Sequence, residues 1–244
     1  MYIKIKPIEA IKTILWKRKQ KKEGTYPYSG LEIFMGRQGG GKTLSASELI
    51  KRRLDEYPRC MFITNTEIKG IENETKYFKD SQELVELLKN ELVAEKREGY
   101  LIFIDEIHVV LAELFGKTDP IFLTFLSQQR KLSINIIGTS QMYNKLPRVI
   151  RDYLRQSGEI ILCSNAFKIL QINRRLNMEN VTEDSKNNLD YSGCTWEIFT
   201  HTRELYESYN TFSVITQIQG LLKQNLRNLD SLGQERKEIG LNGE

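Results

Sequence analysis

The chain has 244 residues, of which 40% are hydrophobic and 28% are charged, and its net charge is +4. This length and balance are typical of one full-size globular domain with some extra segments. Three scattered cysteines, Cys60, Cys163 and Cys194, argue against a disulfide framework or a zinc site, and no apolar run is long enough to cross a membrane. We therefore expect a protein of a reducing, cytoplasmic compartment.

The positive charge is concentrated at the amino terminus. Residues 1–24 carry eight lysines and arginines against two glutamates, a charge of +6, which leaves −2 for the rest of the chain. Apolar residues recur in this arm at helical spacing: Ile8, Ile11, Ile14 and Leu15, with Trp16 beside them. The pattern predicts a basic amphipathic helix that either binds a membrane surface or nucleic acid, or packs on the domain before a solvated run of charges. A linker is expected at 23–30.

A glycine-rich loop, GRQGGGKT over 36–43, follows the apolar strand predicted at 31–35 and opens a predicted helix over 42–57. It fits the phosphate-binding pattern G-x-x-x-x-G-K-[ST]. Glycines let consecutive backbone N–H groups turn inward around an anion, and the helix adds the positive end of its dipole. We expect Lys42 to reach the β- and γ-phosphates of ATP and Thr43 to bind Mg²⁺. The expected nucleotide contacts are Gly36, Arg37, Gln38, Gly39, Gly40, Gly41, Lys42, Thr43 and Leu44.

Predicted strands and helices alternate along the rest of the chain. Apolar strands are expected at 59–65, 100–106, 134–141 and 158–164, and helices at 79–99, 118–131 and 146–156. Two later strands or a hairpin are expected at 167–176 and 195–205, with a polar loop at 177–192. This alternation predicts an α/β fold with a central, mostly parallel sheet flanked by helices, followed by a C-terminal β-hairpin region.

Three parts of the chain are expected to differ in organisation. Residues 1–24 form the basic arm, residues 25–219 form the nucleotide-binding domain, and residues 220–244 form a polar tail that is a frayed helix or disordered.

Two acidic residues end the apolar strand at 100–106. Asp105 is placed to hold, through water, the Mg²⁺ that bridges the phosphates, so Thr43 and Asp105 are the expected metal site. Glu106 is placed to polarise a water for in-line attack on the γ-phosphate. His108 follows as a lone histidine, which we interpret as a packing or solvent-facing residue.

A glutamine ends the apolar strand INIIGTSQ at 134–141. In this class of fold one strand lies between the phosphate-loop strand and the Asp-Glu strand. A polar side chain at its end can contact both the γ-phosphate and the attacking water. Gln141 is the first choice for this role, with Ser140 and Thr139 behind it.

These motifs, in this order, resemble the HerA–FtsK superfamily of DNA-pumping ATPases. That superfamily has a phosphate loop, an Asp-Glu strand, then an Arg, ten residues and a strand ending in Gln, and Arg130 precedes Gln141 with this spacing. Within the superfamily, 61–65 and 205–214 resemble Zot-like phage proteins. The lack of a membrane span and the compact size are closer to the small genome-packaging ATPases of membrane-containing viruses.

The resemblance implies a RecA-like core, ATP and Mg²⁺ as cofactors, a homo-hexameric ring and DNA threaded through it. The catalytic set is then Lys42, Glu106, Gln141 and Arg130. The Arg130 guanidinium either reaches a neighbour's γ-phosphate or forms a local salt bridge. Basic residues that could face DNA are Lys51–Arg53, Asn173–Arg175 and, in a pore, Lys145 and Arg148, which could equally be a solvated helix start.

Three functions are compatible with these residues. The first is an ATP-driven DNA translocase that packages a viral or phage genome, in the host cytoplasm or virion, with a capsid vertex or portal as partner. The second is a membrane-associated Zot-like morphogenesis ATPase anchored by residues 1–24. The third is a nucleotide-binding regulator that hardly hydrolyses, which Glu106 disfavours.

Overall fold

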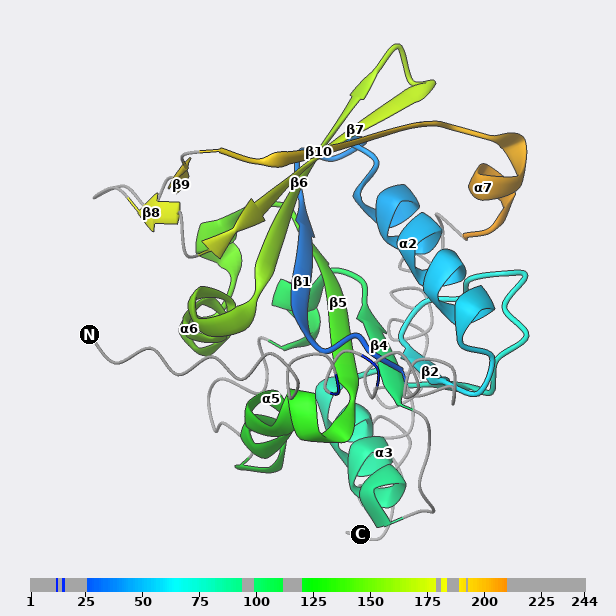
Figure 1. Ribbon diagram of the computed structural model, residues 1–244, viewed down its shortest axis with the longest axis vertical. Helices are drawn as coiled ribbons and strands as arrows, with labels where there is room; N and C mark the ends of the chain where they lie inside the picture. Colours follow the sequence, from blue (N-terminus) through cyan, green and yellow to red (C-terminus); the bar gives the residue numbers. More distant parts are fainter. Residues whose placement is uncertain are drawn as a thin grey trace, which may run out of the picture. The chain divides into compact units, whose positions relative to one another are not determined.

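A computed structural model describes residues 26–93, 99–111, 120–178, 181–183, 189–191 and 193–209, together with Lys12 and Leu15. Its centre is an eight-stranded sheet with the strand order β10-β7-β6-β1-β5-β4-β2-β3 (Figure 1). The strands are β1 (Gly30–Met35), β2 (Met61–Thr64), β3 (Thr75–Tyr77), β4 (Tyr100–Ile104), β5 (Ile134–Ser140), β6 (Glu159–Ala166), β7 (Leu170–Asn177) and β10 (Thr195–Thr200).

All but the last of the described helices connect successive strands of this sheet, and the last one follows strand β10. They are α2 (Lys42–Glu56), α3 (Ser81–Val93), α4 (Ile107–Val110), α5 (Pro120–Leu132), α6 (Arg148–Ser157) and α7 (Arg203–Glu207), with a 3-10 turn η2 (Tyr143–Lys145). Asp80 caps α3, because its carboxylate accepts a hydrogen bond from the backbone N–H of Glu83 at 2.9 Å. Within the described residues, no helix combines the length and apolarity that a membrane crossing requires.

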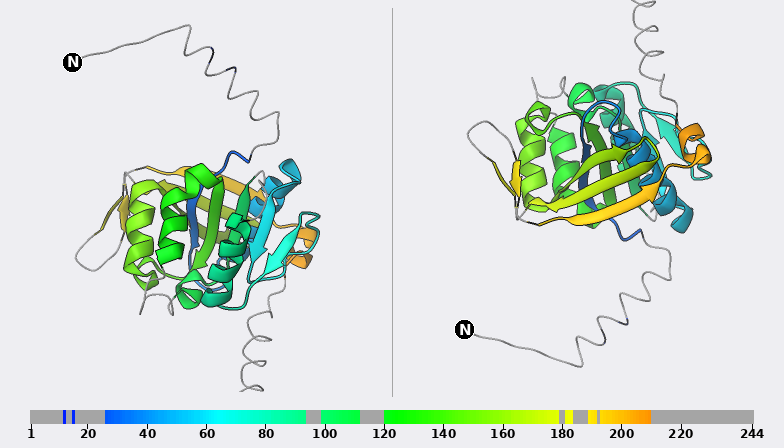
Figure 2. Two further views of the ribbon diagram at one scale, coloured as in Figure 1. Left: turned by 90° about the horizontal axis from the view of Figure 1, so that it is seen from below. Right: turned by 90° about the horizontal axis from the view of Figure 1, so that it is seen from above.

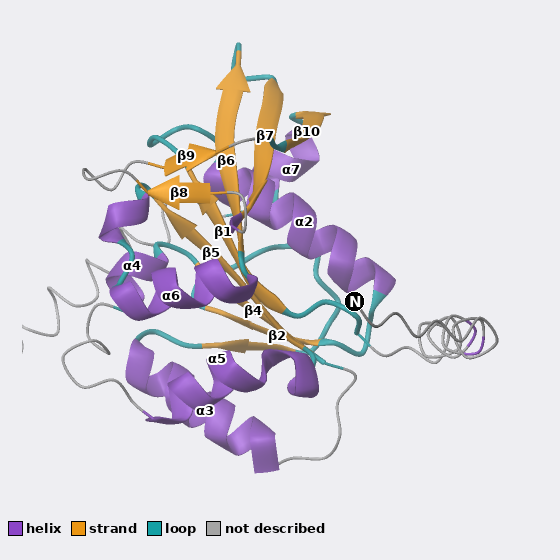
Figure 3. Cartoon of the chain, turned by 60° about the vertical axis from the view of Figure 1, so that its left-hand side comes forward, coloured by secondary structure: helices purple, strands orange, loops and turns teal. Residues whose placement is uncertain are grey.

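Strand direction divides the sheet into two parts. Strands β6, β1, β5, β4, β2 and β3 run parallel, whereas β6–β7 and β7–β10 pair antiparallel. Figure 3 shows the β6–β7 hairpin projecting past the ends of the parallel strands. The predicted α/β class, with a mostly parallel sheet and antiparallel strands toward the C-terminus, is therefore confirmed.

Side chains on alternate sides of the buried strands build two apolar layers. On one face Phe34, Phe62 and Phe103 pack with residues of α2, and on the other Ile33, Ile63 and Ile102 pack with residues of α3, α5 and α6. Figure 2 shows the helices on both sides of the sheet. Near-continuous apolar strands are what a parallel sheet covered on both faces requires.

Several local predictions were wrong. The predicted loop at 177–192 contains a small antiparallel pair, β8 (Val181–Glu183) and β9 (Leu189–Tyr191). The predicted strand at 195–205 ends at Thr200 and is followed by α7, whose Thr202 caps the helix by accepting from Leu205 N–H at 3.2 Å. In the predicted linker, Tyr26 is buried against Tyr28 and Tyr57. Strand β3 and helix α4 were not predicted.

The predicted arm and tail lie outside the described residues, apart from Lys12 and Leu15. The boundaries 1–24, 25–219 and 220–244 therefore stay predictions.

Candidate functional site

The register of the parallel strands brings the predicted motifs to one edge of the sheet. Met35 of β1 pairs with Ser140 of β5, and Ile104 of β4 pairs with Gly138 of β5. The phosphate loop, the Asp-Glu pair and Gln141 each follow one of these strand ends. Strand β5 lies between β1 and β4 as predicted, so all three motifs meet at the carboxyl edge.

The phosphate loop turns through left-handed backbone at Gly39 (φ 75°) and Gly41 (φ 84°), which side chains disfavour. Gly41 is the N-cap of α2, and no side chain caps this helix. The first N–H groups of a 15-residue helix are thus left for a ligand, and an anion is the ligand that they and the helix dipole favour. A Cβ at Gly36 would lie 2.5 Å from the carbonyl oxygen of Cys163, so β6 packs directly on the loop.

Lys42 lies over the loop that it follows. Its side chain is buried and its Nζ donates to the carbonyl oxygen of Arg37 at 3.3 Å. Arg37, Gln38 and Gly39 are exposed at the tip of the loop, whereas the Leu44 side chain is buried. The loop thus places the Lys42 cation beside the backbone N–H groups at the start of α2, which fits a polyphosphate.

Asp105 is held from three sides by neutral donors. Its Oδ1 accepts from Thr43 Oγ1 at 3.3 Å and from Thr139 Oγ1 at 2.6 Å. Asn65 grips its backbone, because Asn65 Nδ2 donates to the Asp105 carbonyl at 3.0 Å and Asn65 Oδ1 accepts from the Asp105 N–H at 2.8 Å. The carboxylate is therefore fixed beside the Thr43 hydroxyl.

This donor set fits a magnesium ion. Mg²⁺ prefers oxygen ligands and is usually bound by one or two protein groups, substrate phosphates and water. The Thr43 hydroxyl and the Asp105 carboxylate supply adjacent oxygens at the mouth of the phosphate loop. Within the described residues there is no group of three or more His, Cys, Asp or Glu that could hold a metal, and a magnesium site of this kind does not need one.

Glu106 has a strained backbone and a partly unsatisfied side chain. Its φ of 49° is unusual for a non-glycine residue, and its N–H donates to Thr139 Oγ1 at 2.8 Å. Its Oε2 is buried and makes no hydrogen bond, although His108 Nδ1 lies 3.3 Å away. A buried carboxylate oxygen with free hydrogen-bonding capacity is suited to accept a proton from water.

His108 is not a simple packing residue. Burial lowers the pKa of His108, the Glu106 carboxylate opposes that effect, and Lys145 and Lys42 add to it, so the net pKa lies below the usual histidine value. The imidazole is then neutral near pH 7, and its contact with Glu106 is a polar contact rather than a full ion pair. The Nδ1 atom of His108 also lies 3.4 Å from Ser140 Oγ.

Of the three residues at the end of β5, Thr139 contacts both acidic residues directly. Gln141 is half-buried and accepts from Lys145 Nζ at 3.2 Å. Ser140 donates to the Met142 carbonyl at 3.2 Å. Sequence reasoning ranked Thr139 last and missed Asn65, although Asn65 directly follows a buried strand that neighbours β4.

Arg130 lies elsewhere. It is exposed on the last turn of α5, before β5 begins, so it lies at the amino edge of the sheet. Strand β5 has 7 residues, which separates Arg130 from the nucleotide edge by about 20 Å. A helix that runs antiparallel to the following strand ends at the edge where that strand begins, so the expected role of Arg130 at a neighbour's γ-phosphate stays a prediction. Arg130 cannot act on a nucleotide bound to its own subunit.

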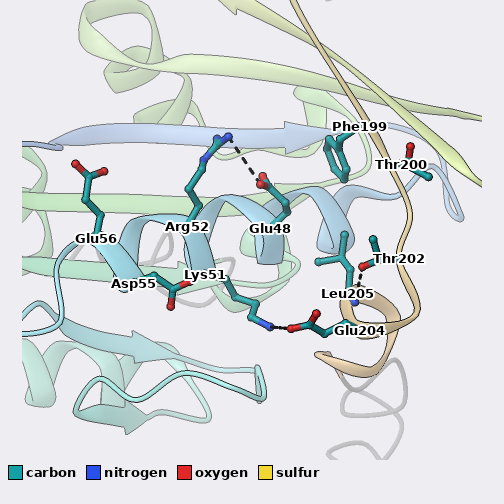
Figure 4. Close-up of a pocket in the computed structure, with 10 residues that line it drawn as sticks. All are labelled: Glu48, Lys51, Arg52, Asp55, Glu56, Phe199, Thr200, Thr202, Glu204 and Leu205. Atoms are coloured by element: carbon teal, nitrogen blue, oxygen red, sulfur yellow. Dashed lines mark hydrogen bonds and ion pairs between the residues drawn. The ribbon is translucent and has the colours of Figure 1, made fainter.

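The predicted DNA-facing groups are mostly paired within the domain. Arg53 is buried against Glu32, with Nη1 to Oε1 at 2.6 Å, and Arg175 is ion-paired with Glu32 and Glu159. Lys51 and Arg52 line a cavity of about 730 Å³ between α2 and the β10–α7 segment (Figure 4). There Lys51 Nζ lies 3.8 Å from Glu204 Oε1, and Arg52 forms ion pairs with Glu48 and Glu197.

Comparison with known proteins identifies a family and several similar folds. The sequence profile of the ATPase family associated with various cellular activities (AAA) matches residues 33–162. No curated protein matches. The N-terminal domain of zonular occludens toxin from Neisseria meningitidis is 17% identical, with a TM-score of 0.49 over 75% of this chain and 99% of that one.

Two further solved structures are similar at lower scores. The genome packaging NTPase B204 from Sulfolobus turreted icosahedral virus 2, in complex with ATP-gammaS, is 11% identical, with a TM-score of 0.46 over 66% of this chain and 95% of that one. The KaiC-like protein PH0186 from Pyrococcus horikoshii OT3 is 14% identical, with a TM-score of 0.43 over 74% and 93%. The profile match spans more than half of the chain, from β1 through β6, and includes the phosphate loop and the Asp-Glu pair. The chain belongs to the AAA family of P-loop ATPases.

Proposed function

We propose that this ATPase uses ATP hydrolysis to move DNA, and that its task is to package a viral or phage genome. The observation that carries the hydrolytic part is the meeting of Lys42, Asp105 and Glu106 at one sheet edge. The DNA part is supported by the motif order, which resembles the HerA–FtsK superfamily and includes a strand ending in Gln141 between the other two.

In this proposal each residue has a separate task. Lys42 and the N–H groups of the loop neutralise the β- and γ-phosphates. The Thr43 hydroxyl and, through water, the Asp105 carboxylate would hold Mg²⁺, which would stabilise the charge of the transferred phosphoryl group. Glu106 accepts the proton of the attacking water, and Gln141 orients that water.

A non-hydrolysing regulator fits the site less well. A nucleotide switch needs the phosphate loop and the Thr43–Asp105 pair, but it does not need a buried, hydrogen-bond-free carboxylate oxygen such as Glu106 Oε2. A carboxylate in this position is expected where it has a chemical role, which here is to accept a proton from water.

The test is ATP-dependent displacement of a third strand from a DNA duplex by the full chain. The wild-type protein should displace it with ATP and fail with a non-hydrolysable analogue. Lys42→Ala should fail in both conditions, while Lys89→Ala, an exposed lysine on α3, should match wild type. If the protein hydrolyses ATP but displaces no strand on single- or double-stranded substrates, the ATPase part of the proposal stands and the DNA translocase part fails.

An experiment on the amino-terminal arm, residues 1–24, can distinguish the packaging proposal from a role in membrane-associated morphogenesis. Its charge of +6 and apolar residues predict salt-sensitive attachment to an anionic surface. Deleting Met1–Lys22 should leave basal ATPase intact and weaken binding to DNA under the packaging proposal, or to anionic liposomes under the alternative. Unchanged binding to both would make the arm a packing element.

A further inference from the structure

Gln171 is a fully buried polar residue near the start of β7, 131 positions after Gly40 of the phosphate loop. Its Nε2 donates to the carbonyl oxygen of Gly40 and to Oδ1 of Asn173, both at 3.1 Å. Its Oε1 lies 3.0 Å from Nε2 of His201. Since an amide oxygen only accepts, His201 Nε2 carries the proton. Both polar ends of the Gln171 amide are thus used, and its orientation is determined.

The loop packs directly on this amide. A Cβ at Gly41 would lie 2.1 Å from Gln171 Oε1, and the φ of 84° at Gly41 also favours glycine. Asn165 of β6 adds a second contact, donating from Nδ2 to the Gly39 carbonyl at 2.6 Å. The outer side of the loop is therefore backed by polar side chains of the β6–β7 hairpin.

The contact with the Gly40 carbonyl has a consequence for the opposite side of the same peptide. In a planar trans peptide the C=O of Gly40 and the N–H of Gly41 point in opposite directions. Holding the carbonyl toward Gln171 therefore aims the Gly41 N–H away from β7, toward the side of the loop where we expect the phosphates.

His201 is itself anchored at the far end. Its backbone N–H donates to the Ile169 carbonyl at 2.8 Å, and its unprotonated Nδ1 can accept from the Tyr206 hydroxyl 2.6 Å away. The chain of contacts thus runs from α7 and the turn of the β6–β7 hairpin, through His201 and Gln171, to the loop.

We propose that Gln171 is a positioning residue for nucleotide binding, and that His201 orients it. Gln171 acts through the Gly40–Gly41 peptide, keeping its N–H directed at the phosphates before the nucleotide arrives. Preorganised donors bind an anion more tightly because no reorganisation opposes binding. The proposal rests on the proposed binding of ATP at this loop.

The first test compares Gln171→Met with wild type by titrating a fluorescent ADP analogue. Methionine keeps the length and buried volume of the side chain but removes its hydrogen bonds. We expect affinity to fall about tenfold or more, with KM for ATP rising more than kcat falls. Gln128→Met on α5 makes the same change far from the loop and should match wild type. A folded Gln171→Met protein with a lower Tm but affinity within about twofold of wild type would show that Gln171 only packs.

The second test uses His201 and stands even if Gln171→Met fails to fold. His201→Gln can keep a donor near Gln171 Oε1, whereas His201→Leu cannot. We expect the glutamine variant to bind the ADP analogue within about threefold of wild type and the leucine variant about tenfold more weakly. Equal affinities in the two variants would overturn the proposal. Absence of nucleotide binding in the wild type would instead overturn the proposed function.

Discussion

The two ends of the central strands carry polar clusters of opposite character. At the amino end, Glu32, Arg53 and Arg175 are held in ion pairs, and Asn135 joins them through hydrogen bonds to Glu32 and Arg53. At the carboxyl end, Asp105 is held by hydroxyls and an amide, with no cation against it among the described residues, and Glu106 keeps a buried oxygen without a hydrogen bond. One cluster is closed by its own charges, and the other is left open for a ligand.

The difference teaches how one sheet separates stability from chemistry. Burial would raise the pKa of Glu32, but Arg53 and Arg175 outweigh it and hold that pKa below its usual range. Burial would likewise lower the pKa of Arg175, but Glu32 and Glu159 keep it above the usual arginine value. These charged groups of the amino end are therefore already paired with one another. The carboxylates of the open cluster keep free hydrogen-bonding capacity, which a bound phosphate, metal ion and water require.

The largest expected effect is at the open cluster. Glu106→Gln keeps size and hydrogen bonding but removes the base, so turnover should fall by about 10²–10⁴-fold while ATP still binds. Steady-state ATPase and nucleotide titration on the same protein measure the two quantities. Turnover within about threefold of wild type, a loss below about 0.7 kcal/mol of barrier, would remove Glu106 from the role of water-activating residue.

Arg130 tests whether the two ends of the sheet meet across subunits. Since it lies about 20 Å from its own nucleotide edge, it can act only on a neighbour's γ-phosphate, where an arginine contributes on the order of 10³ in rate. Arg130→Ala should abolish turnover and keep ATP binding. Mixing it with Lys42→Ala should restore some activity at interfaces that pair an intact loop with an intact Arg130.

The adjacent Lys131→Ala is the matched control for Arg130→Ala, because it removes an exposed cation from the same helical turn. If the two inactive variants assemble together and ATPase never exceeds that of either alone, the shared-site role of Arg130 fails.

How much the sequence predicts depends on whether a feature is local or long-range. The phosphate loop, the Asp-Glu strand end and helices α2 and α5 are set by neighbouring residues, and each was predicted near its observed bounds. The roles of Arg53 and Arg175 were not, because their partner Glu32 lies 21 and 143 positions away. Read as runs of basic residues they suggested DNA contacts, whereas in the fold Arg53 is buried and Arg175 is half-buried, and both are ion-paired.

The same distinction explains the misjudged residues of the site. Thr139 contributes to the site because β5 neighbours the strand that carries the Asp-Glu pair, so that its hydroxyl reaches the Glu106 N–H. Asn65 contributes because it follows β2, which pairs with the same strand on the other side. Strand order was predictable in outline, but which side chains touch across neighbouring strands depends on register. Arg130 shows the converse case, since its spacing from Gln141 matched a motif while the helix direction placed it at the other edge.

Breaking the closed cluster should cost stability rather than chemistry. Glu32→Gln leaves Arg53 and Arg175 without their shared carboxylate, and losing one partner of a buried pair costs about 3–5 kcal/mol of the free energy of unfolding. Urea denaturation measures this loss, with nucleotide affinity of the folded protein expected to stay near wild type. Glu207→Gln, which removes an exposed i,i+4 pair with Arg203, is the control and should cost less than about 0.5 kcal/mol. Equal losses in both variants would contradict the assignment of Glu32 to a stabilising cluster.

The smallest expected effect is a loss of unfolding free energy at acidic pH that belongs to the closed cluster alone. The folded-state pKa of Glu32 is depressed, so its contribution is present above the unfolded value of about 4.5 and is lost as the pH falls toward the folded value. One proton is taken up on unfolding in that window, which limits the slope to about 1.4 kcal/mol per pH unit. The difference in unfolding free energy between wild type and Glu32→Gln should therefore be constant from pH 7 to about 5 and shrink below pH 4.5. A difference that stays constant down to pH 3.5 would mean that the carboxylate charge of Glu32 is not what stabilises the amino end of the sheet.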